Sequence, residues 1–167
     1  KPKKKINKVK YLFIDLKNKK KLFKNLNQFK FQYVIYAAGY IEHKKYDAEG
    51  IKYINDNIQN FSNLVFSLNK HKLIKFVNIS SSDEYGICDA PQKEEGLFLP
   101  LTPYANLKSY NSSLLKFLSQ TSKLSYVNII TFLIYGPGQK NDRFVPSLIS
   151  RFIKNKKFTL KFPNFIR

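Results

Sequence analysis

The sequence predicts an α/β protein whose strands form a doubly wound parallel sheet. Four short, nearly unbroken apolar runs alternate with longer stretches in which apolar residues recur three and four positions apart. Strands that are apolar throughout are typical of parallel sheets, because helices cover both faces of such sheets. Strand and helix alternate along the chain, and this order is the pattern of a doubly wound sheet.

The four predicted strands are short runs rich in β-branched and aromatic residues, which favour strand over helix at these lengths. They lie at residues 10–16, 31–39, 73–80 and 125–136. The second run closes on Gly39, and the third ends in a run of serines. The loop at residues 81–102 follows that serine end, and sheets of this kind bind ligands at the carboxyl ends of their strands.

Amphipathic helices are predicted between and after these strands. They lie at residues 17–29, at residues 47–69, from Pro103 onward, and at residues 143–154. Thr102 stands where its hydroxyl can cap the third helix, and Pro103 suits the first turn because it lacks an N–H group. The third helix therefore has a well-defined start beside the serine loop.

Length and composition limit the classes of protein that need to be considered. The chain has 167 residues, which predicts one domain on a prior of roughly 100–200 residues each. No apolar run approaches the roughly 18 residues of a membrane helix, and no metal-ligand motif is found. Cys88 is the only cysteine, so no intrachain disulfide can form and a cytoplasmic location is expected.

The net charge of +19 raises the question of nucleic-acid binding. Only three of the 30 basic residues are arginines, although arginine is preferred for bidentate contacts to phosphates and bases. The lysines are spread along the chain among many asparagine, isoleucine and aromatic residues. This distribution favours a solvated lysine surface over a nucleic-acid interface.

Tyr104 and Lys108 lie four residues apart at the start of the third predicted helix. That spacing places two side chains on one face, one turn apart. A tyrosine has a reference pKa of ~10, and a nearby cation favours its phenolate form. The pair is therefore a candidate proton-transferring centre, and the alternative is an exposed helical pair without function.

Four segments together carry a resemblance to a known family. In chain order they read VIYAAG, NISSSDEYG, TPYANLKS and LIYGPGQ. They resemble the extended short-chain dehydrogenase/reductase family, in particular its nucleotide-sugar epimerases and dehydratases. The resemblance implies a Rossmann-like sheet, an NAD cofactor with NADP as an alternative, and a nucleotide-diphospho-sugar substrate.

The resemblance also implies roles for individual residues. Tyr104 matches the family's catalytic base, and Lys108 matches the residue that supports this base and binds the nicotinamide ribose. Ser82 matches the residue that hydrogen-bonds the reacting hydroxyl. Asp83 and Glu84 match the acid–base pair of the sugar 4,6-dehydratases. Their segment is one residue shorter than in those dehydratases, and this form is closer to some 4-keto-sugar reductases.

Two further segments match cofactor contacts of the family. Asp15 and Leu16 resemble the pair that meets the adenine ring, and Ala37, Ala38 and Gly39 resemble the small residues against which the dinucleotide lies. The family's glycine-rich motif G-x-x-G-x-x-G is not found in the chain. We therefore expect an internal fragment, incomplete at both ends, that binds NAD weakly by itself and whose substrate-binding part begins after about residue 137.

The leading interpretation is an NAD(P)-dependent nucleotide-sugar epimerase or 4,6-dehydratase. A 4-keto-6-deoxy nucleotide-sugar reductase is the alternative within the same class. A different class would be a non-catalytic, lysine-rich Rossmann-like domain that binds nucleic acid, or an inactive fragment. The resemblance also suggests a homodimer formed through the two long helices, at residues 47–69 and from Pro103.

Overall fold

The computed structural model describes residues 5–39, 47–68 and 72–159. The chain forms two compact units, Lys1–Thr131 and Phe132–Arg167. That a substrate-binding part begins after about residue 137 stays a prediction. The two units are described separately.

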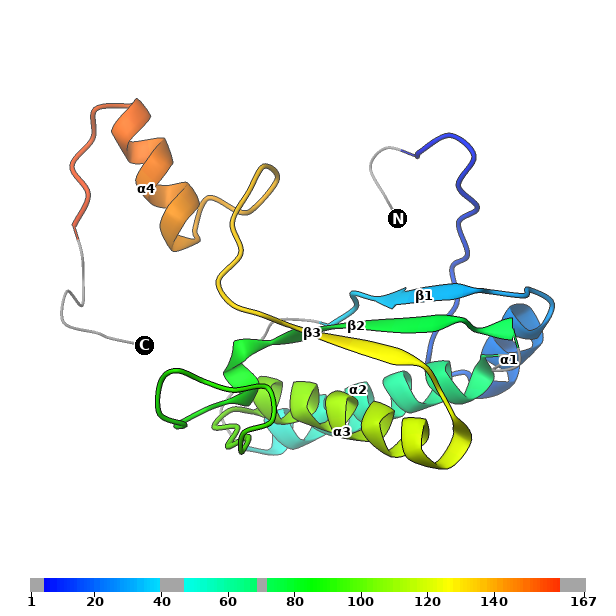
Figure 1. The fold of residues 1–167 in the computed structure, drawn as a ribbon. Coiled ribbons are helices and arrows are strands. Elements are labelled where there is room, and N and C mark those ends of the chain that lie inside the picture. Colours follow the sequence, from blue (N-terminus) through cyan, green and yellow to red (C-terminus); the bar gives the residue numbers. More distant parts are fainter. Residues whose placement is uncertain (1–4, 40–46, 69–71, 160–167) are drawn as a thin grey trace. The chain divides into compact units, whose positions relative to one another are not determined.

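A three-stranded parallel sheet organises the first unit. Its strands are β1 (Tyr33–Tyr36), β2 (Lys75–Ser81) and β3 (Tyr126–Thr131), in the order β1-β2-β3. The helices α2 (Ala48–Ser67) and α3 (Pro103–Ser122) make the two crossovers and lie on the same side of the sheet (Figure 1). The predicted α/β class with a parallel sheet is therefore confirmed.

The strand predicted at residues 10–16 is wrong, since these residues form no strand. A strand requires a neighbour that shares its backbone hydrogen bonds, and β1 pairs with β2 alone among the described residues. The strand predicted at residues 125–136 is shorter than expected. It ends at Thr131 because β2 ends at Ser81, the residue opposite Thr131 in the ladder.

Each helix of the first unit begins at a residue whose side chain accepts a backbone N–H bond. Asn18 caps α1 (Lys19–Asn27), and Asp47 caps α2. Thr102 Oγ1 accepts from the Ala105 N–H at 3.1 Å and caps α3, with Pro103 in the first turn as predicted. The start of α3 is thereby fixed beside the carboxyl end of β2.

The hydrophobic core lies between the sheet and the helices. Its buried members are Leu22, Leu26, Tyr36, Phe61, Val65, Leu68, Phe76, Leu115, Leu118 and Leu124. The Phe61 ring meets those of Tyr36 and Phe76 edge-on, at centroid distances of 4.7 and 6.1 Å. This contact joins α2 to both β1 and β2.

The second unit contains α4 (Phe144–Ile153) and the turn that precedes it. The Phe144 ring packs edge-on against Phe158 at 5.6 Å. The predicted helix at residues 143–154 is therefore confirmed within one residue at each end.

Candidate active site

Tyr104 and Lys108 share one buried face of α3, at the end of the helix that lies beside the carboxyl end of β2. Only 7% of Tyr104 and 6% of Lys108 is exposed. Lys108 Nζ donates a hydrogen bond to the carbonyl of Ile79 at 2.8 Å and lies 5.8 Å from the centre of the Tyr104 ring. The ammonium is thus held by the sheet and lies close to the phenol.

The end of β1 reaches the same ammonium through Gly39. This glycine has φ +147°, and a Cβ atom at its position would lie 3.5 Å from Lys108 Nζ. Ala37 and Ala38, which precede it, are exposed. Small residues of this kind let a ligand approach the backbone closely.

Burial perturbs the charges at this site. Removal of Lys108 from water lowers the pKa of its ammonium, and the negative charge of Glu84 partly opposes this effect. Burial also raises the pKa of Glu84 to about 7, while the Ser112 hydroxyl, the Ser81 backbone and the Lys108 charge act in the opposite direction. Perturbed pairs of this kind are typical of functional sites.

The serine–acid segment turns sharply at the end of β2. Ser80 in β2 is buried, and Ser81 Oγ accepts the Asp83 N–H at 3.3 Å, which caps the short 3-10 helix Ser82–Glu84. Ser82 and Asp83 are half-buried, whereas Glu84 is completely buried. The catalytic roles assigned to Ser82, Asp83 and Glu84 remain predictions.

A buried chain of hydrogen bonds lies behind the pair, and the sequence analysis missed it. Asn78 Nδ2 donates to Asn128 Oδ1 at 2.6 Å, and Asn128 Nδ2 donates to Ser112 Oγ at 2.9 Å. Ser112 Oγ in turn donates to the Lys108 carbonyl at 3.1 Å. The signal was an asparagine in the middle of each of two apolar strands, in the segments FVNIS and YVNII.

The whole arrangement of parallel strands, crossover helices and buried pair can be compared with known proteins. A family model described as "NAD dependent epimerase/dehydratase family" matches residues 1–162. The chain belongs to this family. The resemblance predicted from the four sequence segments is therefore confirmed.

The chain is similar to curated proteins and to solved structures. The dTDP-D-glucose 4,6-dehydratase of Dictyostelium discoideum is 25% identical over 143 residues, which are 78% of this chain and 33% of that protein. RMD from Pseudomonas aeruginosa, complexed with NADPH, aligns with a TM-score of 0.73 and 26% identity over 86% of this chain and 51% of that chain. UDP-glucuronic acid 4-epimerase from Bacillus cereus, complexed with NAD, aligns with a TM-score of 0.70 and 26% identity over 86% and 45%.

These relatives bear on cofactor and length. The family is NAD-dependent by its description, and the two aligned structures hold NADPH and NAD, so the predicted cofactor class is confirmed for the family. The chain spans about one third of the length of the curated relatives that it matches. It spans about half of the two aligned structures.

Asp15 and Leu16, the predicted adenine contacts, lie just before α1. The Leu16 carbonyl accepts from Asn63 Nδ2 at 2.9 Å, and Asp15 Oδ1 accepts from the Lys17 N–H at 3.0 Å. Among the described residues, neither residue hydrogen-bonds to Tyr104 or Lys108. Their role as cofactor contacts remains a prediction.

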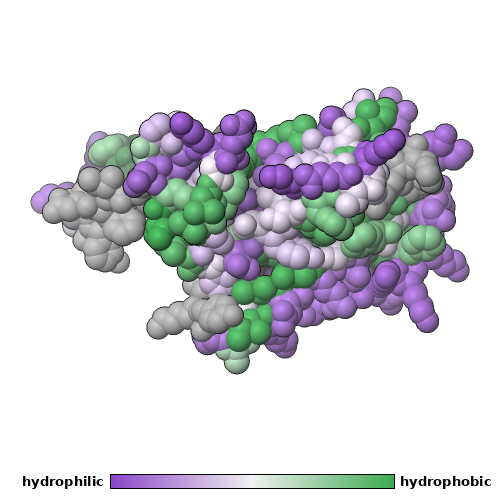
Figure 2. All heavy atoms as spheres, turned by 60° about the horizontal axis from the view of Figure 1, so that its bottom comes forward, coloured by the Kyte–Doolittle hydropathy of each residue, from purple (hydrophilic) through white to green (hydrophobic). Residues whose placement is uncertain are grey.

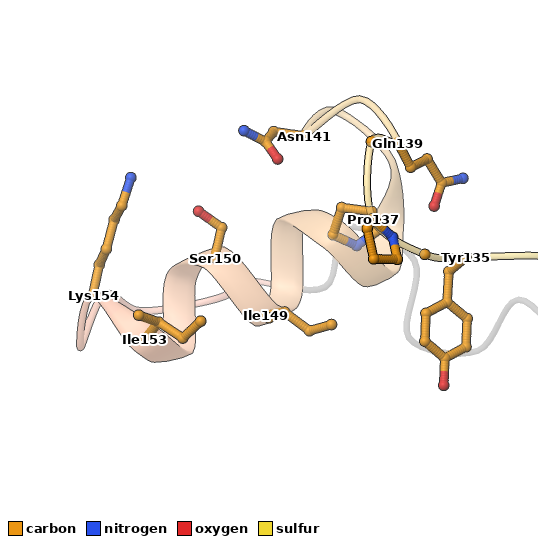
Figure 3. Close-up of a pocket in the computed structure, with 11 residues that line it drawn as sticks. Tyr135, Pro137, Gln139, Asn141, Ile149, Ser150, Ile153 and Lys154 are labelled. Atoms are coloured by element: carbon orange, nitrogen blue, oxygen red, sulfur yellow. The ribbon is translucent and has the colours of Figure 1, made fainter. Parts of the chain in front are cut away.

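The second unit contains an open pocket of about 530 Å³. The turn from Tyr135 to Asn141 lines it together with α4 residues such as Ile149 and Ile153 (Figure 3). The described residues include no group of three or more His, Cys, Asp or Glu side chains arranged to hold a metal ion. No helix among them is long and apolar enough to span a bilayer.

On the face shown in Figure 2, hydrophilic side chains lie in several separate groups. Lys17 and Asp56 form the one salt bridge among the described residues, with 2.7 Å between Nζ and Oδ2.

Proposed function

We propose that this chain forms the cofactor-binding side of an NAD(P)-dependent nucleotide-sugar epimerase or dehydratase, with Tyr104 as its proton-transferring group. The observation that carries the proposal is the Tyr104–Lys108 pair. The two side chains are buried one turn apart on α3, and the ammonium is bound to Ile79 and faces Gly39. Family membership and the cofactors of the aligned structures support it.

The residues at the carboxyl edge of the sheet fit a dinucleotide. An ammonium has three N–H donors, and the Ile79 carbonyl takes one of those on Lys108. The remaining donors can bind ribose hydroxyl groups, while Gly39 and the two exposed alanines before it leave room for the ring system. The cofactor supplies a site that accepts a hydride from the sugar carbon and can return it.

The protein residues handle the proton. As the sugar C–H bond breaks and its hydride departs, the Tyr104 phenolate takes the proton of the hydroxyl on the same carbon, so that a carbonyl forms. Lys108 stabilises the phenolate through its positive charge. Ser82 holds the reacting oxygen by a hydrogen bond. Return of the proton and hydride, with the hydride on the opposite face of the carbonyl, gives the epimer.

A dehydratase needs a further acid–base pair that removes water from the neighbouring carbons. Asp83 is half-buried and accessible, whereas Glu84 has no exposed surface. The two adjacent acids therefore differ in their access to a substrate, and Asp83 is the better candidate for contact with the sugar.

A reductase of 4-keto sugars is the second candidate. Two observations favour it: the serine–acid segment is one residue shorter than in the dehydratases, and one aligned structure is an NADPH complex. In that reaction the cofactor is consumed, and Tyr104 donates its proton to the oxygen of the carbonyl as the hydride arrives.

The test uses the protein with whatever flanking sequence its gene encodes, incubated with uridine and thymidine diphosphate sugars. We expect an isomer from epimerisation, a 4-keto-6-deoxy sugar from dehydration, or oxidation of NADPH from reduction. Tyr104→Phe should lower turnover at least about 100-fold, since it removes the proton-transferring group.

Tyr110→Phe is the matched control on the same helix, where the hydroxyl lies 3.0 Å from Ser62 Oγ. It should leave turnover nearly unchanged. Normal turnover by a folded Tyr104→Phe protein would overturn the assignment.

A further inference from the structure

Two asparagines lie opposite each other in the middle of two apolar strands. Asn78 of β2 pairs in register with Asn128 of β3, and Asn78 has no exposed surface. A buried amide costs free energy unless its polar atoms find partners, so an apolar residue would be the simpler choice for stability here. A bond between the two amides is enough to favour one register of the strands. Asn128 makes a second bond, however, and that bond leaves the sheet.

The second bond of Asn128 reaches α3. Asn128 Nδ2 donates to Ser112 Oγ at 2.9 Å, and this hydroxyl donates to the Lys108 carbonyl at 3.1 Å. Serines in helices often bond to the carbonyl four residues earlier, as Ser122 does with Leu118 at 2.8 Å in the same helix. Ser112 differs from Ser122, among the described residues, in that a strand side chain also binds its hydroxyl. It therefore connects the sheet to the backbone of Lys108.

Lys108 is attached to β2 in two ways. Its carbonyl is linked through the Ser112 and Asn128 side chains to that of Asn78. Its ammonium donates to the carbonyl of Ile79 at 2.8 Å. Asn78 and Ile79 are consecutive residues, so both attachments end on the same short piece of β2. A shift of α3 relative to the sheet would stretch one attachment or the other.

The same piece of β2 leads directly into the serine–acid segment. Ser82 follows Ile79 by three residues, and Tyr104 precedes Lys108 by about one turn of α3. The position of Tyr104 relative to Ser82 therefore depends on how α3 is fixed to β2. Reactions in active sites are sensitive to such positions, since a misplacement of about 1 Å can cost roughly 100-fold in rate.

We propose that Asn128 and Ser112 are positioning residues, which hold the turn of α3 that carries Tyr104 and Lys108 in its place beside the end of β2. The consequence for catalysis rests on the proposed function of Tyr104 and Lys108. Asn128 and Ser112 do not touch the substrate in this account, because they act through the backbone of Lys108. Loss of their link slows the chemical step and leaves binding of the nucleotide sugar nearly unchanged.

The first experiment breaks the link with Ser112→Ala, in the protein with its flanking sequence and with a uridine or thymidine diphosphate sugar that it converts. The bond between Asn78 and Asn128 stays. We expect kcat to fall about 10-fold and KM for the sugar to stay within about twofold, because the link affects the geometry of the reaction and not binding. Ser112→Thr keeps a hydroxyl that can bond to the same carbonyl and should restore most of kcat.

Ser113→Ala is the matched control for this experiment. It makes the same change of residue type, and so of helix propensity, at an exposed position of the same helix. It should leave both kcat and KM unchanged. A fall in kcat that is confined to Ser112→Ala therefore reports the lost link and not a more stable helix.

The second experiment breaks the link at its other end with Asn128→Val, which leaves the Ser112 hydroxyl in place. If the two side chains act as one link, the double variant Ser112→Ala/Asn128→Val should lose about 10-fold in kcat, as each single variant does, and not about 100-fold. Two unrelated structural effects would multiply. Asn128→Val also deprives Asn78 of its partner, so the Ser112 variants decide the proposal if this protein does not fold.

Amide hydrogen exchange followed by NMR tests the link without turnover. Ser112→Ala should accelerate exchange several-fold at residues 107–112 of α3, compared with Ser113→Ala, because this half of the helix loses its bond to the sheet. Exchange at residues 115–122, in the apolar half, should be the same in the two variants.

Equal kcat in folded Ser112→Ala and Ser113→Ala would overturn the inference. Equal exchange at residues 107–112 in these two variants would overturn it as well, and so would a double variant whose loss is the product of the two single losses. A failure of the proposed function is a separate outcome, which would appear as normal turnover by Tyr104→Phe. The exchange measurement would then still decide whether the link holds α3 in place.

Discussion

The two halves of α3 differ in the side chains that they bury on the same face of the helix. In the first half the buried face carries polar groups, Tyr104, Lys108 and Asn111. In the second half it carries Leu115 and Leu118, which belong to the apolar core. The change occurs within one turn of helix, and the polar half is the one beside the carboxyl ends of the strands.

The leucines of the second half stabilise the fold, whereas the polar residues of the first half belong to the candidate active site. Leucines in the second half exclude water and pack against neighbours, which is favourable without any need for precise partners. Among the residues that the structure describes, Asn111 Oδ1 in the first half is buried without a hydrogen-bond partner, as are both oxygens of Glu84 on the neighbouring 3-10 helix. Such groups reduce stability, so their presence favours a functional explanation for the first half and the segment beside it.

The largest effect on stability is expected from the apolar half. Leu115 is 0% exposed, and Leu115→Ala should lower the free energy of unfolding by about 3 kcal/mol, because it leaves a cavity in the core. Denaturant unfolding followed by circular dichroism measures this. Phe117→Ala, at an exposed site on the same helix, should lower it by less than about 1 kcal/mol. An equal loss of unfolding free energy in Leu115→Ala and Phe117→Ala would contradict the difference between core and surface positions on this helix.

The next effect concerns Glu84, on the 3-10 helix beside the polar half, and it depends on pH. The pKa of Glu84 is about 7 in the folded protein and 4.5 without burial, so the folded state binds this proton more tightly. The resulting contribution of Glu84 to the free energy of unfolding is fully present below pH 4.5 and is lost as the pH rises to about 7. It amounts to roughly 3 kcal/mol, since each pKa unit corresponds to about 1.4 kcal/mol.

Unfolding curves between pH 4.5 and 8, for the unsubstituted chain and Glu84→Gln, measure this contribution. We expect the difference in stability between the two proteins to move in favour of Glu84→Gln as the pH rises. A difference that is constant across the range would mean that the buried carboxylate keeps its ordinary pKa.

The smallest effect is expected at Asn111. Asn111→Leu replaces a buried amide by an apolar side chain of similar size and should raise the free energy of unfolding by about 1 kcal/mol. Asn106→Leu, at an exposed position five residues earlier, should change it by less than about 0.5 kcal/mol. A loss of stability in Asn111→Leu, seen in thermal unfolding, would indicate that the amide makes favourable contacts in solution.

Local sequence signals predicted the parts of the fold that depend on local chemistry. Thr102 and Pro103 fixed the start of α3, and the spacing of four between Tyr104 and Lys108 placed them on one face. These features depend only on residues within one helical turn of each other. They could therefore be predicted without knowledge of the rest of the chain.

Features that depend on distant partners could not be predicted in this way. The run at residues 10–16 has the composition of a strand, but strand formation also needs a neighbouring backbone, which composition does not report. The full burial of Glu84 could not be predicted from the sequence, because the polar residues before it, Ser82 and Asp83, are only half-buried. The difference in burial between Glu84 and these two residues depends on how α3 packs against the 3-10 helix.

The Asn78–Asn128 bond has a consequence for the assembly of the sheet. The two amides face each other in adjacent strands, each flanked by valine and isoleucine. If β3 slid by one residue along β2, each amide would lie opposite a valine or isoleucine, and the fully buried Asn78 amide would lose its hydrogen-bond partner. The hydrogen-bonded pair thus favours the observed register of β2 and β3 over registers shifted by one residue.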